Sequence, residues 1–75
     1  MREIHENQVY RHFKGNLYHV LAIATHTETE ELMVVYRALY GEQRVFVRPY
    51  AMFAEEVDHQ KYPDVTQKYR FEEAE

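Results

Sequence analysis

The chain has 75 residues, 45% of them apolar, which is enough for one small domain with a single core. It contains no cysteine, no serine and only two glycines, so disulfides, thiolate metal sites, serine nucleophiles and glycine-rich phosphate loops are excluded. The formal net charge of −4 argues against a generic duplex-binding protein, because such a protein needs a basic excess to neutralise phosphates.

No part of the sequence indicates a membrane or secretory protein. No apolar run comes near the ~18 consecutive residues of a membrane-spanning helix. The first residues, MREIH, lack the apolar segment of a secretory signal. We therefore expect a cytoplasmic protein that does not enter a membrane.

The N-terminal half predicts two strands joined by a hairpin. Residues 1–8 are polar and predict a flexible N-terminal segment. Val9–Lys14 alternates between apolar and polar side chains and predicts a strand. Gly15 and Asn16 then form a two-residue turn, because both tolerate a positive φ angle. Leu17–Thr25 follows as a longer strand that is apolar on both faces.

Two further strands follow a polar loop at His26–Glu31. Leu32–Tyr40 is rich in valine and tyrosine, which favour a strand, although its leucine, methionine and alanine make a helix the competing interpretation. A turn at residues 41–43 leads to a short fourth strand, Arg44–Arg48. Pro49 ends this strand, because proline has no N–H group for the ladder.

The sequence after Pro49 decides the fold class. Residues 49–52 predict one turn of 3₁₀ helix and Phe53–Val57 a fifth strand, so the predicted fold is all-β, a small bent five-stranded SH3-like barrel. The alternative is a short helix over Tyr50–Asp58, which gives an α+β fold. In either case residues 9–71 form one domain, in which the tail packs as a strand or a wrapped arm, and residues 72–75 form a frayed acidic end.

An ordered set of motifs resembles a known family. The set contains YRHFKG at Tyr10–Gly15, HTET at His26–Thr29, VVY at Val34–Tyr36, LYG at Leu39–Gly41 and VRP at Val47–Pro49. Over residues 9–57 it resembles the small bacterial family known as domain of unknown function 1653, although Thr27 stands where that family often has a serine. The resemblance implies a compact bacterial module, often standing alone, and names no ligand.

Two histidines could face each other across the first hairpin. With Gly15 and Asn16 as the loop, His12 lies opposite His19, and directly opposed Cβ atoms are ~4.5–5.5 Å apart. Such a pair could share a divalent metal with a third ligand, or simply pack. We favour packing, and we expect no metal and no cofactor.

Basic and aromatic side chains gather on the predicted strands. Arg11, His12 and Lys14 form a basic cluster on the first strand, which Arg37 and Arg48 can join from the third and fourth strands. The tyrosines expected near this cluster are Tyr10, Tyr18, Tyr36 and Tyr40. This combination predicts a surface for single-stranded nucleic acid. Tyrosines beside the acidic loop that contains Glu28 instead predict a groove for a basic or proline-rich peptide. His26 and Glu28 could also form a hydrogen-bonded pair, although a barrel this small has little room for a pocket that excludes water.

The leading interpretation is therefore a non-enzymatic interaction module that binds a protein or peptide, and the alternative is a small barrel that binds RNA or single-stranded nucleic acid. The sequence leaves the oligomeric state open. The candidate ligand-binding residues are Arg11, His12, Lys14, Tyr18, His26, Glu28, Tyr36 and Arg48.

Overall fold

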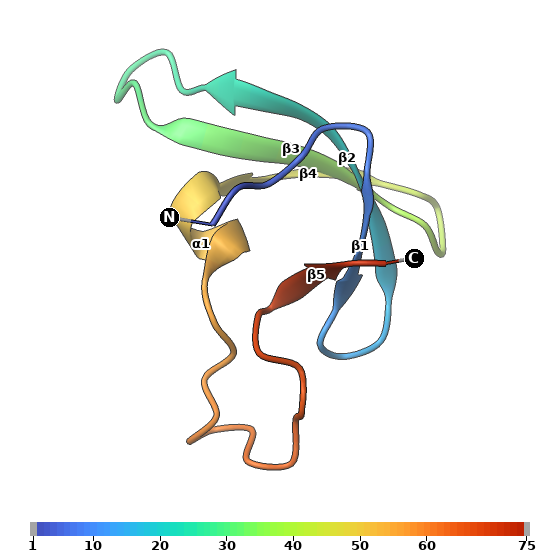
Figure 1. Cartoon of the computed structure of the whole chain (residues 1–75). Helices are drawn as coiled ribbons and strands as arrows, with labels where there is room; N and C mark the ends of the chain where they lie inside the picture. Colours follow the sequence, from blue (N-terminus) through green and yellow to red (C-terminus); the bar gives the residue numbers. More distant parts are fainter. Residues whose placement is uncertain (1, 75) are drawn as a thin grey trace.

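The computed structural model describes residues 2–74 and contains one antiparallel sheet of five strands and one short helix (Figure 1). The elements are β1 (Val9–His12), β2 (Leu17–Thr25), β3 (Leu32–Ala38), β4 (Val45–Pro49), α1 (Tyr50–Ala54) and β5 (Phe71–Glu73). The strands lie in the order β4-β3-β2-β1-β5, so β4 and β5 are the two edges of an open sheet. The predicted closure of the strands into an SH3-like barrel is therefore wrong, because β4 and β5 do not pair with each other. Among the described residues no helix is long and apolar enough to cross a membrane.

The first hairpin has a longer loop than predicted. The N–H of Gly15 donates to the carbonyl of His12 at 2.7 Å, and the N–H of His12 donates to the carbonyl of Asn16 at 2.9 Å. The loop therefore has three residues, with Gly15 at its last position and a φ of 106°. Three-residue hairpins of this kind require a positive φ at that position, which glycine accepts most readily.

This loop changes the register of the hairpin. His19 faces Val9 rather than His12, so the predicted pair of histidines is wrong. An odd shift in register moves side chains to the opposite face of the sheet. His12 consequently lies on the inner face with Tyr10, and His19 lies on the outer face with Val9.

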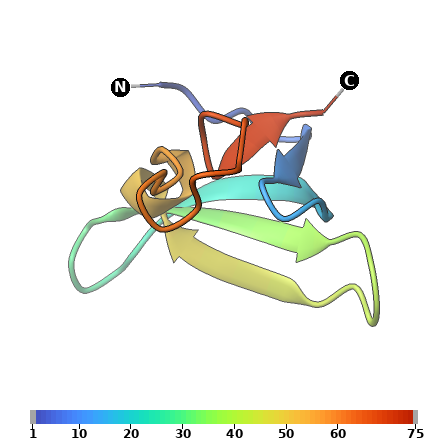
Figure 2. The same ribbon diagram turned by 90° about the horizontal axis from the view of Figure 1, so that it is seen from below.

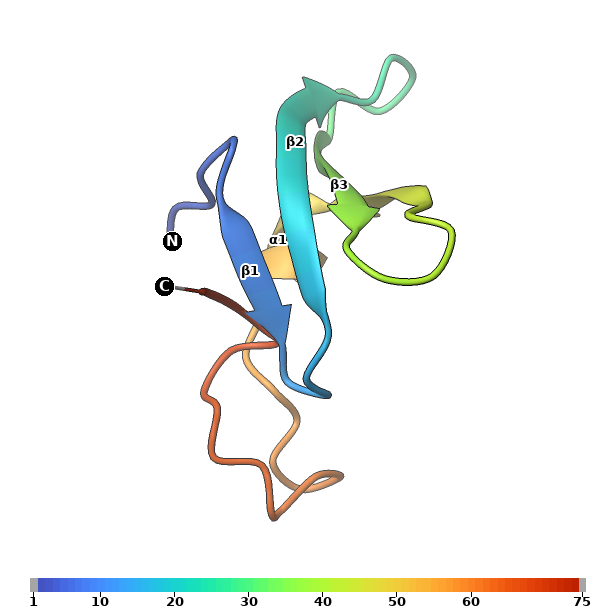
Figure 3. The same cartoon turned by 90° about the vertical axis from the view of Figure 1, so that its right-hand side faces the viewer.

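A β-bulge bends the longest strand. The register between β2 and β3 shifts between Val20 and Ala22, which leaves Leu21 as an extra residue. A bulge increases the bend of a strand, and Figure 3 shows β2 as a long curved strand between β1 and β3. Because of the extra residue, Val20 and Ile23 both pack on the core, although three positions separate them.

The predicted fifth strand at Phe53–Val57 is wrong, and so is the 3₁₀ turn before it. The chain forms α1 at Tyr50–Ala54 instead, and the fifth strand is Phe71–Glu73, which pairs with β1. The reason lies in the spacing of apolar side chains. Tyr50, Phe53 and Ala54 stand at positions i, i+3 and i+4 and all reach the core, which a helix permits and a strand does not. The fold is therefore mostly β with one short helix after the fourth strand, as in the alternative interpretation.

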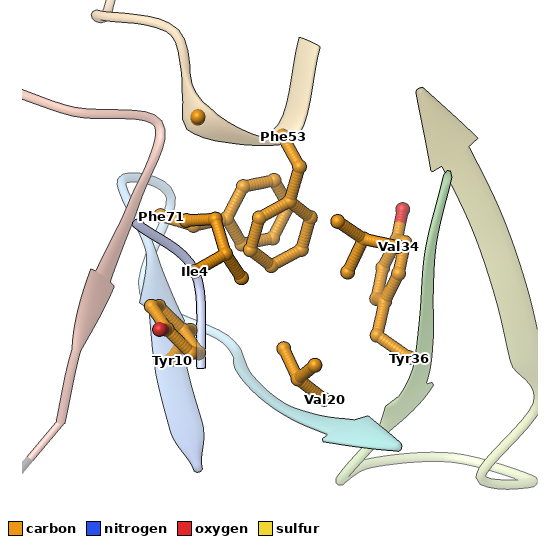
Figure 4. Packing of buried hydrophobic residues seen from close by; sticks show 8 residues of the cluster. Ile4, Tyr10, Val20, Val34, Tyr36, Phe53 and Phe71 are labelled. Carbon is orange, nitrogen blue, oxygen red and sulfur yellow. The ribbon is translucent and has the colours of Figure 1, made fainter. Parts of the chain in front are cut away.

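The core lies on the inner, concave side of the sheet, beneath α1. Phe53 of α1 stacks on Phe71 of β5, with ring centroids 4.0 Å apart and an interplanar angle of 8° (Figure 4). Phe53 also meets Tyr10 and Tyr36 edge to face. The buried cluster consists of Ile4, Tyr10, Val20, Val34, Tyr36, Phe53, Ala54 and Phe71. Several large apolar side chains lie outside this core and are exposed, among them Leu39, Val45, Phe46 and Met52.

The N-terminal segment, predicted to be flexible, contributes to this core. Ile4 is only 4% exposed and belongs to the buried cluster. Its N–H donates to the Tyr50 hydroxyl at 2.6 Å, and the N–H of His5 donates to the Tyr10 hydroxyl at 2.8 Å. Arg2 donates to the backbone carbonyls of Ala54 and Phe71. These contacts connect residues 2–5 to β1, α1 and β5.

We predict that Ile4→Ala lowers the free energy of unfolding by about 2–5 kcal/mol, because it removes a buried side chain and leaves a cavity. Urea denaturation followed by tyrosine fluorescence measures the change. Glu3→Ala, at the exposed neighbouring position, is the control and should have little effect. Equal midpoints for Ile4→Ala and the wild type would show that this segment is not part of the cooperative unit.

Candidate functional site

A small hollow of about 160 Å³ opens on the inner face of the sheet, near the end where β2 begins and β3 ends. Its walls come from β1, β2, β3, β4, β5 and the loop after β3. The lining residues are His12, Tyr18, Tyr36, Tyr40, Phe46, Arg48 and Phe71.

Strand pairing brings these side chains to one face. His12 pairs with Phe71 across β1 and β5, and Tyr36 pairs with Phe46 across β3 and β4. Directly paired residues project to the same side, as do residues two positions apart in one strand. Arg48 therefore joins Phe46 on this side.

Tyr18 is the centre of the aromatic wall. Its ring meets the rings of Tyr36, Tyr40 and Phe71 edge to face at 5.5, 5.6 and 5.6 Å. Edge-to-face contacts at these distances are attractive and orient both rings. The hydroxyl oxygens of Tyr18 and Tyr40 are 2.8 Å apart and share a hydrogen bond. The wall is therefore held in shape before any ligand arrives.

His12 is neutral at neutral pH, with a defined tautomer. The backbone N–H of Lys14 donates to its Nδ1 at 3.1 Å, so the ring proton is on Nε2. Burial, together with the positive charges of Arg70, Arg48 and Lys14, lowers the pKa of His12 to about 4. The ring also contacts Phe71 edge to face at 4.9 Å.

Tyr18 is protonated at neutral pH. Burial and the hydrogen bond with Tyr40 raise its pKa to about 12. Neither Tyr18 nor His12 changes charge near pH 7, whereas a general acid or base works best with a pKa near the working pH. This face of the sheet is thus built for hydrogen bonding and packing.

Arg48 supplies the positive charge of the hollow. Its guanidinium lies 5.5 Å from the centre of the Phe71 ring, within the range of a cation–π contact. Within residues 2–74 the ion pairs are those of His5 with Glu3 and Glu73 and of Arg70 with Glu55, and none involves Arg48. Among the residues that the structure describes, no carboxylate lines the hollow.

Strand β4 borders the hollow and has an open edge. The N–H of Ala38 donates to the carbonyl of Arg44 at 3.0 Å, which fixes the alternation of the β3–β4 ladder. Along an antiparallel strand, every second residue directs its backbone N–H and C=O groups to the neighbouring strand. Phe46 and Arg48 therefore direct these backbone groups to β3, whereas Val45 and Val47 direct theirs away from it. The exposed fractions of Val45 and Val47 are 49% and 60%, and β4 is the outermost strand on its side of the sheet (Figure 2).

The structure brings half of the predicted ligand-binding residues together. His12, Tyr18, Tyr36 and Arg48 all line the hollow. Lys14 lies beside them, where its charge acts on His12 while its ammonium is 5.7 Å from the Tyr62 ring. Arg11, His26 and Glu28 are not part of the hollow.

Arg11 is exposed on the outer face, because it alternates with Tyr10 and His12 along β1. His26 and Glu28 lie in the loop at the opposite end of the β2–β3 hairpin. There Nδ1 of His26 accepts the backbone N–H groups of Glu28 at 3.1 Å and Thr29 at 3.4 Å. His26 thus stabilises a turn. Tyr18 and Tyr36 lie in the hollow, away from this loop, whereas Glu31 of the acidic loop lines a separate pocket with Leu32, Tyr50 and Ala51.

The predicted pair of His12 and His19 does not provide a metal site, because the two side chains lie on opposite faces. Within residues 2–74 no three histidine, aspartate or glutamate side chains are grouped as metal ligands.

Three lining residues were not among the predicted site. Tyr40 was predicted only to lie near the basic cluster, and Phe46 and Phe71 were not proposed as ligand-binding residues. The alternation of Phe46 with Arg48 in RVFVR was a sufficient signal to place both on one face. Phe71 had no such signal, because its position depends on pairing with β1 across 59 residues of chain.

We predict that the His12 side chain titrates near pH 4, which NMR of its ring protons measures directly. The unfolded chain takes up this proton near pH 6.5, so between pH 6.5 and 4 the unfolded state binds more protons than the folded state. The contribution of His12 to stability is thus complete above pH 6.5 and is lost as the pH falls. His12→Gln should flatten this dependence, and His19→Gln should not. A His12 pKa near 6.5 would contradict the half-buried placement of this side chain beside three cationic groups.

Comparison with known proteins places this architecture in a family. Residues 8–73 match the family described as protein of unknown function (DUF1653). A crystal structure of a protein of this family from Bordetella bronchiseptica is similar at 33% sequence identity and a TM-score of 0.72, over 89% of this chain and 83% of that chain. A comparison with curated proteins gave no match. The resemblance carried by the sequence motifs is confirmed and extends through β5: the chain belongs to the DUF1653 family.

Proposed function

We propose that the protein is a non-enzymatic interaction module that binds an extended peptide segment of a partner protein along β4. One side chain of the peptide enters the aromatic hollow. The observation that carries this proposal is the position of Phe46 and Arg48, which lie on an edge strand and also line the hollow.

The backbone of β4 supports strand addition. Val45 and Val47 direct their N–H and C=O groups to the open edge, and the hydrogen bonds of the described residues do not use them. An unpaired edge of this kind is a template for another strand. Peptides that add to a sheet gain affinity from these main-chain bonds and specificity from pockets for alternate side chains. The hollow provides such a pocket on one face.

The size of the hollow supports a single side chain as its occupant. Pockets for whole small-molecule ligands measure about 300–1,000 Å³. The hollow holds about 160 Å³, the volume of about five water molecules. A nucleotide or a large cofactor exceeds this volume, whereas one side chain of a bound peptide fits.

The alternative, binding of single-stranded nucleic acid, has weaker support. Arg11 and Arg37 are exposed on the outer face, and His12 and Arg48 lie on the inner face, so the predicted basic cluster is divided between two surfaces. The inner face retains Arg48 and Lys14, and the net charge of the chain is −4.

Selection of binders from a displayed library of random nine-residue peptides tests the proposal. Val47→Pro removes only an outward N–H group, which an edge strand tolerates without losing a bond to β3. Val47→Thr is the matched control, because it keeps the N–H group and the β-branched shape. Selected peptides should bind the wild type and Val47→Thr, and should bind Val47→Pro at least about tenfold more weakly, since one or more main-chain hydrogen bonds are lost.

Amide spectra of each variant show that the fold is retained. Peptides that bind Val47→Pro as tightly as the wild type would contradict strand addition at β4. A library that yields no binder, together with salt-sensitive binding of a single-stranded RNA pool, would favour the nucleic-acid alternative.

A further inference from the structure

The polar groups of the hollow are hydrogen-bond donors. Arg48 carries five N–H donors and no acceptor. Its position over the Phe71 ring, 5.5 Å from the centroid, restricts the guanidinium without using its N–H groups. His12 adds an Nε2–H donor, because its Nδ1 already accepts the N–H of Lys14.

The two tyrosines add a further donor. Only one hydrogen lies between the hydroxyl oxygens of Tyr18 and Tyr40 at their separation of 2.8 Å. The hydroxyl that accepts this hydrogen still has its own hydrogen to donate. A ligand group that accepts several hydrogen bonds matches these donors, whereas a cationic side chain does not.

The charges around the hollow also favour a ligand group that is anionic. The groups whose charges act on His12 are Arg70, Arg48 and Lys14, all of them cationic. Arg70 is neutralised by Glu55 at 2.6 Å, which leaves Arg48 as the cation in the lining with no carboxylate partner among residues 2–74. The acidic loop that includes Glu28, Glu30 and Glu31 lies at the other end of the β2–β3 hairpin and does not compensate it.

We propose that the side chain accepted by the hollow is an aspartate or glutamate whose carboxylate binds Arg48. This inference rests on the proposed function and names the class of partner, an acidic peptide segment. A planar guanidinium binds a carboxylate with two parallel hydrogen bonds, and the contact of Arg48 with the Phe71 ring places the guanidinium in the hollow. The partner chemistry is the reverse of the basic or proline-rich peptide that the sequence suggested.

A direct test uses N-acetylglutamate N-methylamide as the probe and the glutamine analogue as its neutral isostere. NMR titration should show shifts at His12, Tyr18 and the Arg48 side chain with the glutamate probe, and much smaller shifts with glutamine. The bound carboxylate should also raise the pKa of His12, because it favours the imidazolium. Inorganic phosphate is a third probe, and a stronger response to phosphate than to glutamate would contradict the assignment to a carboxylate.

Variants distinguish a specific role of the Arg48 guanidinium from a non-specific effect of the positive charge of the protein. Arg48→Gln should abolish the response to the glutamate probe, and Arg48→Lys, which keeps the charge and loses the planar fork, should weaken it. Arg37→Gln is the control, because Arg37 is exposed on the outer face of the neighbouring strand. An unchanged response in Arg48→Gln would overturn the inference. If Arg48→Gln does not fold, Arg48→Lys and the comparison of the glutamate and glutamine probes still test whether Arg48 binds the carboxylate.

The selected peptides distinguish failure of this inference from failure of the proposed function. We expect an acidic residue at one position of the peptides, with a loss of roughly tenfold to hundredfold in affinity when it is changed to its amide. Peptides that depend on the N–H of Val47 but tolerate this change would overturn the inference and leave strand addition intact. A glutamate response without any peptide binding would retain the carboxylate site and overturn the proposed function.

Discussion

The stacked rings of Phe53 and Phe71 hold the two edges of the sheet together, and the rest of the structure depends on that contact. Phe53 lies in α1, which directly follows the edge strand β4, and Phe71 begins the opposite edge strand β5. With their centroids 4.0 Å apart, the two rings connect the opposite edges of the sheet over its concave side. The sheet is therefore curled but still open, and β4 keeps an unpaired edge.

The same contact positions one wall of the hollow, the side chain of Phe71. Phe71 is buried against Phe53, and it also receives the edge of the His12 ring and the guanidinium of Arg48. Phe71 thus contacts both His12 of β1 and Arg48 of β4 on the concave face. The core and the candidate binding site thus share a wall, because both lie on the concave face. A substitution at Phe71 would alter both at once, which makes Arg48 the more informative position.

Much of the secondary structure was predictable from local patterns. β2 has the predicted bounds, and β1, β3 and β4 differ from their predicted ranges by a few residues at their ends, because alternation and β-branched side chains act locally. The helix after Pro49 was predictable from the same kind of pattern, since its apolar residues follow a helical spacing. Four of the eight candidate site residues line one hollow, which reflects their positions on the inner-facing sides of the strands.

The sequence by itself determined the first four strands, the absence of thiol chemistry and the family, because each depends on residue types and their order along the chain. Only the tertiary structure decided the register of the first hairpin, the fifth strand and the occupants of the hollow. The register follows from Gly15 closing a three-residue loop rather than a two-residue one, and this difference of loop geometry moves His12 away from His19. The fifth strand and Phe71 are placed by pairing with β1 across most of the chain, which no local pattern records.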